Sequence, residues 1–161
     1  MDLIRSRFPA APVEQILLFR LIVILGREYS ALFDRVLRPR GLNETDFRVL
    51  AMIFVQPDGM AHPGDICAGV AQSPANMTRI TDNLVARDLI TRVPSESDRR
   101  RMVLRITPRG ERLLEECLPL TSDLVRRAFS SLSEEDIREV IERLKKVAAS
   151  LEAQCDAREH G

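Results

Sequence analysis

The residues best suited to bind an anion form an arginine cluster in the second half of the sequence. Asp98 is followed directly by Arg99, Arg100 and Arg101. Seven arginines stand against three acidic residues from Arg87 to Arg109, although the whole chain has 24 basic and 24 acidic residues. The positive charge is therefore a local excess. Guanidinium groups bind phosphate oxygens through paired hydrogen bonds, so a phosphate-bearing partner is expected here.

Two short runs of alternating apolar residues flank the cluster. Leu89, Thr91 and Val93 precede it, and residues 102–106 follow it with the same period of two. Alternation of this kind predicts half-buried β-strands. The sequence thus predicts a two-stranded ribbon with the arginines at its tip.

A helix with polar side chains in its first turns is predicted just before the ribbon. Ser73 suits the N-cap and Pro74 the first helical position, where its missing N–H costs nothing. A helix followed by an arginine-tipped ribbon is typical of a winged helix-turn-helix, which contacts DNA through both parts. Arginine can bind guanine with two hydrogen bonds, and asparagine can bind adenine. The predicted DNA contacts from this helix are Ser73, Asn76, Met77, Thr78 and Arg79.

Two of these assignments have structural alternatives. Ser73 can serve only as a helix cap, and Met77 can belong to the apolar core. An exposed arginine run can likewise be a solvated surface without a partner, although its place between two strands favours a contact.

Long apolar helices must position this segment. Apolar residues recur at helical spacing from Val13 to Arg38, around much of the helix girth, which indicates burial or a partner chain. Residues 108–129 and 133–151 predict two further helices. We expect a mainly α (α+β) single domain with a winged helix-turn-helix lobe at 43–107. The helices at 13–42 and 108–155 would form a two-fold dimer that presents two lobes to successive major grooves, about 34 Å apart.

Composition excludes several other classes of protein. The longest apolar run, Ile16 to Leu25, is interrupted by Arg20 and is too short to span a bilayer. Three widely spaced cysteines (Cys67, Cys117 and Cys155) suit a reducing cytoplasm better than a disulfide scaffold. We find no signal peptide, glycine-rich phosphate loop, nucleophile–base pair or metal-ligand spacing. We therefore expect a cytoplasmic protein that is not an enzyme and needs no cofactor or metal.

With these residues laid out, the chain resembles the MarR family of transcriptional regulators over about residues 14–152. The most specific match is Asp98 to Thr107, which has the family's wing pattern of Asp, Arg two residues on, and an aliphatic residue with Thr at the end of the second strand. Two positions depart from the pattern. Ala71 and Asp88 stand where the family often has glycine, and neither change removes a predicted DNA contact.

The resemblance implies roles for particular residues. Arg100 would enter the minor groove, Asp98 would orient its guanidinium, and Arg99 and Arg101 would contact phosphates. An effector pocket is expected between the DNA-binding lobe and the dimerisation helices, and its candidate lining residues are Arg20, Tyr29 and Phe47.

Segments such as Gly41–Phe47 and Arg92–Arg100 look more particularly like the branch that represses multidrug efflux pumps. That branch implies a repressor released from a pseudo-palindromic operator by a small lipophilic or phenolic ligand. Two alternatives remain open at this point. One is a winged-helix module that binds another protein, and the other is a regulator that senses oxidants through cysteine. Family members that sense peroxide carry a cysteine early in the first helix, whereas no cysteine precedes Cys67 here.

Overall fold

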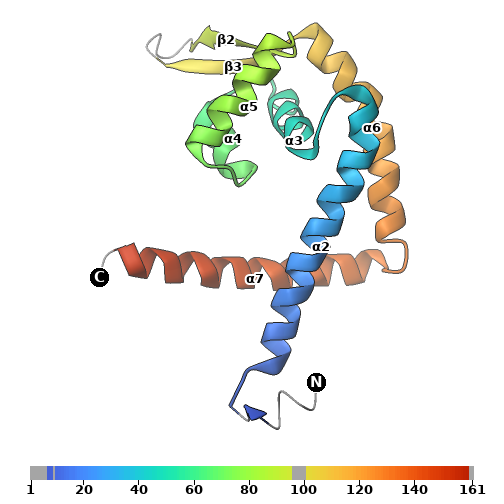
Figure 1. Cartoon of the computed structure of the whole chain (residues 1–161), viewed down its shortest axis with the longest axis vertical. Helices are drawn as coiled ribbons and strands as arrows, with labels where there is room; N and C mark the ends of the chain where they lie inside the picture. Colours follow the sequence, from blue (N-terminus) through green and yellow to red (C-terminus); the bar gives the residue numbers. More distant parts are fainter. Residues whose placement is uncertain (1–6, 9, 96–100, 160–161) are drawn as a thin grey trace. The chain divides into compact units, whose positions relative to one another are not determined.

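The protein is mainly helical and carries one small antiparallel sheet (Figure 1). The structure, a computed structural model, describes residues 7–8, 10–95 and 101–159. The chain divides into two compact units, Met1–Ser122 and Asp123–Gly161, which are described separately. The elements are α2 (Val13–Leu37), the 3-10 helix η1 (Arg38–Arg40), α3 (Glu44–Phe54), β1 (Met60–Ala61), α4 (Pro63–Gly69), α5 (Pro74–Ala86), β2 (Ile90–Pro94), β3 (Met102–Ile106), α6 (Pro108–Ala128) and α7 (Glu134–Glu159).

Side-chain caps set the helix starts that the sequence predicts. The Asn43 side chain accepts the Asp46 N–H at 2.7 Å, and Asp46 accepts the Asn43 N–H at 3.4 Å, which closes a capping box on α3. Ser73 Oγ accepts the Asn76 N–H at 3.3 Å at the start of α5. Ser133 and Asp136 cap α7 in the same reciprocal way. The predicted cap at Ser73 is confirmed, and Asn43 and Ser133 cap their helices in the same manner.

The predicted ribbon is present as β2 and β3, paired antiparallel with Ile90 opposite Ile106. Ser95 N–H donates to the Arg101 carbonyl at 2.8 Å and closes the pairing next to the tip. A third strand, β1, pairs with the other edge of β3 and was not predicted. Two residues are too few to show alternation, so the sequence carries no strand pattern at β1.

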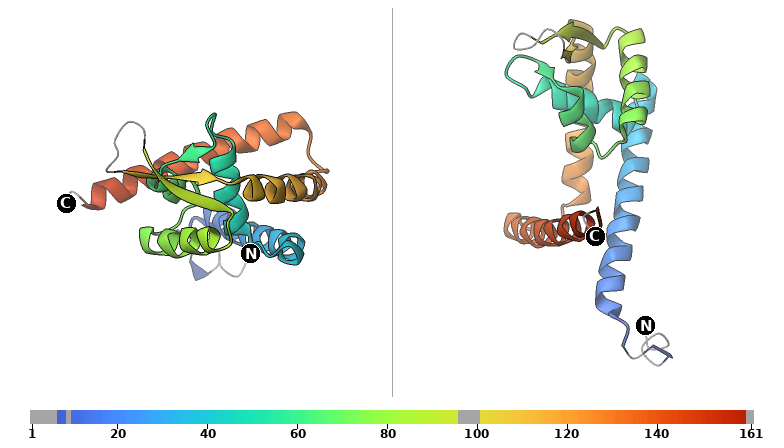
Figure 2. Two further views of the ribbon diagram at one scale, coloured as in Figure 1. Left: turned by 90° about the horizontal axis from the view of Figure 1, so that it is seen from above. Right: turned by 90° about the vertical axis from the view of Figure 1, so that its left-hand side faces the viewer.

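The core of the first unit lies between helices α3, α4 and α5 and the sheet. Contacts join α5 to β2 and α3 to β3, and Figures 1 and 2 show the hairpin beside α5. Apolar side chains fill the space between them. The fully buried members include Leu50, Ile53, Ile66, Leu84, Leu89, Ile90 and Leu104.

The start of α6 packs tightly on the start of β2. Thr107 Oγ1 donates to the Asp88 carbonyl at 2.7 Å and accepts the Gly110 N–H at 3.0 Å. A Cβ at Gly110 would overlap the Leu89 carbonyl oxygen. Position 110 therefore needs glycine because of this close backbone approach.

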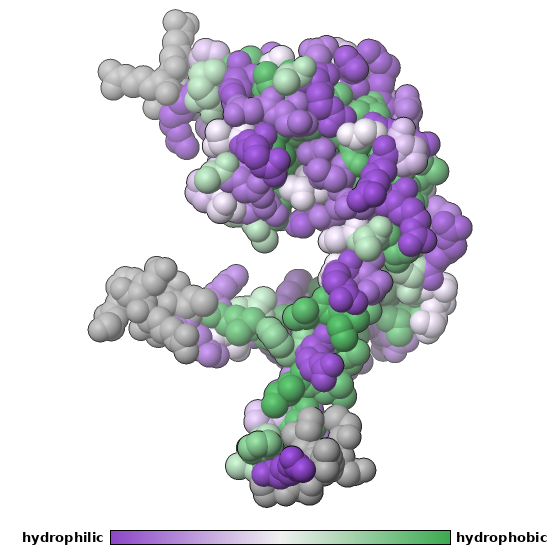
Figure 3. All heavy atoms as spheres, in the orientation of Figure 1, coloured by the Kyte–Doolittle hydropathy of each residue, from purple (hydrophilic) through white to green (hydrophobic). Residues whose placement is uncertain are grey.

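Apolar side chains are exposed along the N-terminal half of α2. Large apolar residues from Ile16 to Leu25 are 38–65 % exposed, and Figure 3 shows them gathered over this helix. In the second unit, α7 exposes a spaced series from Val140 to Leu151. No helix in the described part of the chain is long and apolar enough to cross a membrane. The wide apolar surface of α2 is expected from the sequence to be either buried within the chain or covered by a partner chain. Its exposure fits contact with a partner chain.

Within the described part of the chain, two residues other than glycine adopt a left-handed backbone. Ala71 has φ 52° in the turn between α4 and α5, and Asp88 has φ 57° after α5. These are the two positions where the sequence departs from the glycines of the family pattern. Asp tolerates this conformation better than Ala does, so strain is concentrated at Ala71.

Relief of that strain gives a stability prediction. Ala71→Gly is expected to raise the free energy of unfolding by about 0.5–1 kcal/mol, because glycine adopts positive φ without a Cβ clash. Urea denaturation measures the change. As the control, Ala31→Gly inside α2 should lower the same free energy by about 1 kcal/mol. Equal signs for the two variants would contradict the assigned strain.

Candidate DNA-binding surface

The first turns of α5 present a connected set of polar side chains. Arg79 donates to Asn76 Oδ1 through Nη2 at 2.8 Å and through Nε at 3.3 Å. Asn76 in turn donates through Nδ2 to Gln72 Oε1. Asn76 and Arg79 are three residues apart on α5 and so lie on one helix face, and Gln72 lies just before the Ser73 N-cap. The array therefore presents arginine and amide groups together, which are the groups that bind guanine and adenine edges.

The hydroxyl groups in these turns are committed to the helix itself. The Ser73 hydroxyl caps α5. Thr78 is an exposed residue, and its Oγ1 donates to the Pro74 carbonyl at 3.0 Å. Met77 is only 3 % exposed, so its side chain belongs to the core. We therefore remove Met77 from the DNA contacts predicted from the sequence.

Arg92 on β2 ties the ribbon to α5. Its Nη2 donates to Thr81 Oγ1 at 2.8 Å and to Asp82 Oδ1 at 2.6 Å. Thr81 is buried, and its hydroxyl donates to the Thr78 carbonyl at 3.0 Å. This bridge fixes the angle between the helix and the ribbon. Sequence reasoning missed it, because the partners are ten and eleven residues apart and share no periodicity.

The described part of the ribbon ends beside the arginine cluster. Asp98, Arg99 and Arg100 lie outside the described residues, and Arg101 is exposed next to its backbone bond with Ser95. Arg105 on β3 is exposed too, and its Nη2 lies 3.1 Å from the Met60 sulfur. The ribbon thus carries positive charge along the strand that leads away from its tip.

Two of the three candidate effector residues belong to one aromatic cluster. The rings of Tyr29 and Phe33 have centroids 4.3 Å apart, and Phe33 lies 6.1 Å from Phe47. Burial and the nearby Glu44 raise the pKa of Tyr29. Arg20 is exposed and nine residues earlier on α2, about 13 Å along the helix, so it lies apart from the cluster. Sequence reasoning missed Phe33, which joins the other two rings.

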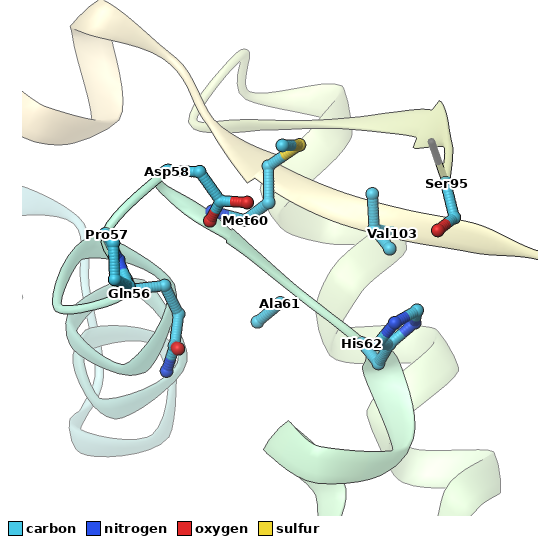
Figure 4. Close-up of a pocket in the computed structure, with 8 residues that line it drawn as sticks. All are labelled: Gln56, Pro57, Asp58, Met60, Ala61, His62, Ser95 and Val103. Atoms are coloured by element: carbon cyan, nitrogen blue, oxygen red, sulfur yellow. The ribbon is translucent and has the colours of Figure 1, made fainter. Parts of the chain in front are cut away.

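A cleft of about 450 Å³ runs beside β1, but it carries no arrangement for catalysis (Figure 4). Its acidic group, Asp58, accepts the Met60 N–H at 3.1 Å and so serves the turn. The His62 ring lies at the start of α4, with no carboxylate beside it among the labelled side chains. The lining residues are Gln56, Pro57, Asp58, Met60, Ala61, His62, Ser95 and Val103.

The cysteines and the metal-binding residue types form no cluster within the described part of the chain. Cys117 is fully buried, and burial raises the pKa of its thiol, which keeps it protonated. Cys67 is half-buried and donates to the Gln72 carbonyl at 2.7 Å. Neither side chain has the exposed, electropositive surroundings of a reactive thiolate.

Comparison with known proteins agrees with this geometry. A sequence model of the MarR family matches residues 40–101. The transcriptional repressor MprA of Escherichia coli K12 is 32% identical over 128 residues, which cover 80% of this chain and 73% of MprA.

Solved structures show the same fold. AbsC, a MarR family regulator from Streptomyces coelicolor, gives a TM-score of 0.80 at 24% identity and covers 89% of this chain and 97% of its own. A mutant MarR from E. coli, solved with operator DNA, gives a TM-score of 0.73 at 24% identity and covers 91% and 99%.

Proposed function

The chain belongs to the MarR family of DNA-binding transcriptional regulators, which are not enzymes, and we propose that it is a dimeric repressor. In this proposal α5 and the wing, meaning β2, β3 and the residues between them, bind a pseudo-palindromic operator in the cytoplasm. The similarity to MprA, a transcriptional repressor, supports repression over activation.

The connected array of Gln72, which precedes α5, with Asn76 and Arg79 on the first turns of α5 carries the proposal. In the structure these side chains bond to one another, so the guanidinium is held near the helix surface. Its donors can exchange Asn76 for the O6 and N7 atoms of guanine without a change in the helix. The wing arginines Arg99, Arg100 and Arg101 add phosphate and minor-groove contacts, with Asp98 orienting Arg100.

The exposed apolar surface of α2 supports the dimer. A series of large apolar residues from Ile16 to Leu25 would otherwise remain in water, at about 25 cal/mol per Å² of apolar surface. Covering it with the same surface of a second chain gives a two-fold assembly. Light scattering at micromolar concentration should return twice the chain mass of 18.2 kDa.

The aromatic cluster of Tyr29, Phe33 and Phe47 supports an effector site for a lipophilic or phenolic ligand. Tyr29 is 41 % exposed while the other two rings are buried, so a ligand ring can stack on the open side of the cluster. A ligand that binds the DNA-free form more tightly than the DNA-bound form would weaken operator binding. The size of the effect is set by the ratio of those two affinities. Control of multidrug efflux genes is the regulatory role that we propose.

A release experiment tests the sensing part. A duplex from the DNA upstream of the chain's own gene is bound, and phenols, uncouplers and antibiotics are added in turn. At least one compound should weaken binding by about tenfold or more, within the usual range of allosteric coupling.

A matched pair of variants locates the effect. Tyr29→Ala should reduce release by that compound and leave ligand-free DNA affinity unchanged, whereas Val55→Ala, at a 72 % exposed position, should change neither. If no compound weakens duplex binding, the proposed effector sensing is wrong, and the proposal of DNA binding still stands.

A further inference from the structure

Four arginines surround a small cavity at the base of the wing, where β2 begins and β3 ends. Arg40 comes from η1, Arg87 from the end of α5, and Arg109 and Arg112 from the first turns of α6. The cavity has a volume of about 260 Å³, and its remaining lining includes Leu89 and Glu116. Segments far apart in the sequence therefore bring four arginine residues to the lining of one cavity.

The positive charge in this cavity is only partly compensated. Arg87 lies 3.5 Å from Asp46 Oδ2. Arg40, Arg109 and Arg112 form no ion pair with any residue that the structure describes. Glu116 follows Arg112 by one helical turn and does not pair with it. Like charges gathered in this way repel one another unless an anion lies between them.

One of the four guanidinium groups is held in place. Arg87 Nη1 donates to Asn83 Oδ1 at 3.4 Å and faces Asp46, whose side chain is only 9% exposed. A Cβ built on Gly41 would lie 3.3 Å from Arg87 Nη2, so the backbone of the η1–α3 turn also packs against this group. A held guanidinium loses less conformational entropy when it binds, which favours ligand binding.

We propose that this cavity is an oxyanion site that takes a phosphate group. Guanidinium matches phosphate in shape and charge, and the small volume suits one or two phosphate groups better than a drug-sized molecule, which needs about 300 Å³ or more. The phosphate can come from a free phosphorylated small molecule or from the backbone of DNA. The site uses none of the aromatic residues of the effector proposal.

The place of the cavity in the fold favours the free molecule. Each wing strand has five residues, so the base lies about 17 Å from Pro94 and Met102, where the described strands end. Arg87 lies eight residues after Arg79, about 12 Å along the axis of α5. The cavity is thus separate from the base-contacting turns of α5 and from the wing tip, although a backbone phosphate flanking the operator can still reach it.

Calorimetric titration of the full-length, DNA-free protein with pyrophosphate tests the first source, with chloride added to keep the ionic strength constant. Pyrophosphate should bind at one site per chain. Arg109→Gln and Arg112→Gln should each weaken that binding by about tenfold, as expected for loss of one charge-assisted contact. Both side chains are exposed, so neither change threatens the fold. Arg138→Gln, an equal change of charge at an exposed position of α7, should leave the affinity unchanged.

Duplex binding across a salt series tests the second source. If pyrophosphate does not bind but Arg109→Gln lowers the salt dependence of duplex affinity by about one counterion, the phosphate belongs to DNA. If Arg109→Gln and Arg112→Gln behave like Arg138→Gln in both experiments, the arginines are solvated surface residues and the site does not exist. Pyrophosphate binding requires no operator, so its failure is distinct from failure of the proposed function.

Discussion

Gly110→Ala is expected to lower the free energy of unfolding by about 3 kcal/mol, the upper end of the usual cost of overpacking. The new methyl group would overlap the Leu89 carbonyl oxygen and press on the Ile106 side chain. Both neighbours belong to the base of the wing, where Thr107 and Leu89 also share a backbone hydrogen bond of 3.1 Å. To make room for the methyl group, α6 would have to move away from β2, which would weaken the packing and the hydrogen bond between them. Urea denaturation followed by circular dichroism measures the loss.

Gly64→Ala is the control for this change. Gly64 lies in the first turn of α4 and a Cβ there meets no atom within 4 Å. Alanine is the better helix former, so this variant should be more stable by about 0.5–1 kcal/mol. A Gly110→Ala protein as stable as Gly64→Ala would show that α6 and β2 can move apart freely, contrary to the packing described.

Arg79→Ala is expected to lower operator affinity by about 5- to 150-fold, which corresponds to about 1–3 kcal/mol for one bidentate contact with a base. Because a base contact carries sequence information, discrimination at one guanine of each half-site should fall as well. The fold should be little affected, since Arg79 is exposed and its hydrogen bonds to described residues go to Asn76 on its own helix. Fluorescence anisotropy with a labelled operator duplex measures the change.

Two controls accompany this variant. One tests whether loss of a positive charge alone weakens binding, and the other tests whether Arg79 contacts a base or a phosphate. Arg138→Ala removes the same charge from the exposed start of α7, outside α5 and the wing, and should leave affinity within about twofold. If Arg79→Ala weakens specific and unrelated duplexes equally, Arg79 contacts phosphate and the base contact is excluded.

Features with a local physical cause could be predicted from the sequence. Asn43, Ser73 and Ser133 each precede a helix and cap it, because a side-chain oxygen there satisfies a free backbone N–H. The alternation around Leu104 placed the ribbon correctly, since strand side chains point to opposite faces.

Features that depend on pairing across the fold could not be predicted in the same way. The strand at Met60 exists only because β3 offers it an open edge, and two residues carry no pattern. The bond from Arg92 to Asp82 depends on how the ribbon folds back on α5. Met77 has a side chain suited to either the core or a base contact, and only the packing of α5 decided for the core.

Affinity for a duplex from the chain's own upstream DNA, measured between 50 and 200 mM salt, tests the central claim of sequence-specific DNA binding most directly. Several phosphate contacts per dimer predict a fall in affinity of about 10³-fold or more over this range. At fixed salt, an unrelated duplex of equal length should bind about 10³-fold more weakly. Equal affinity for the two duplexes, or affinity that does not change with salt, would contradict the account.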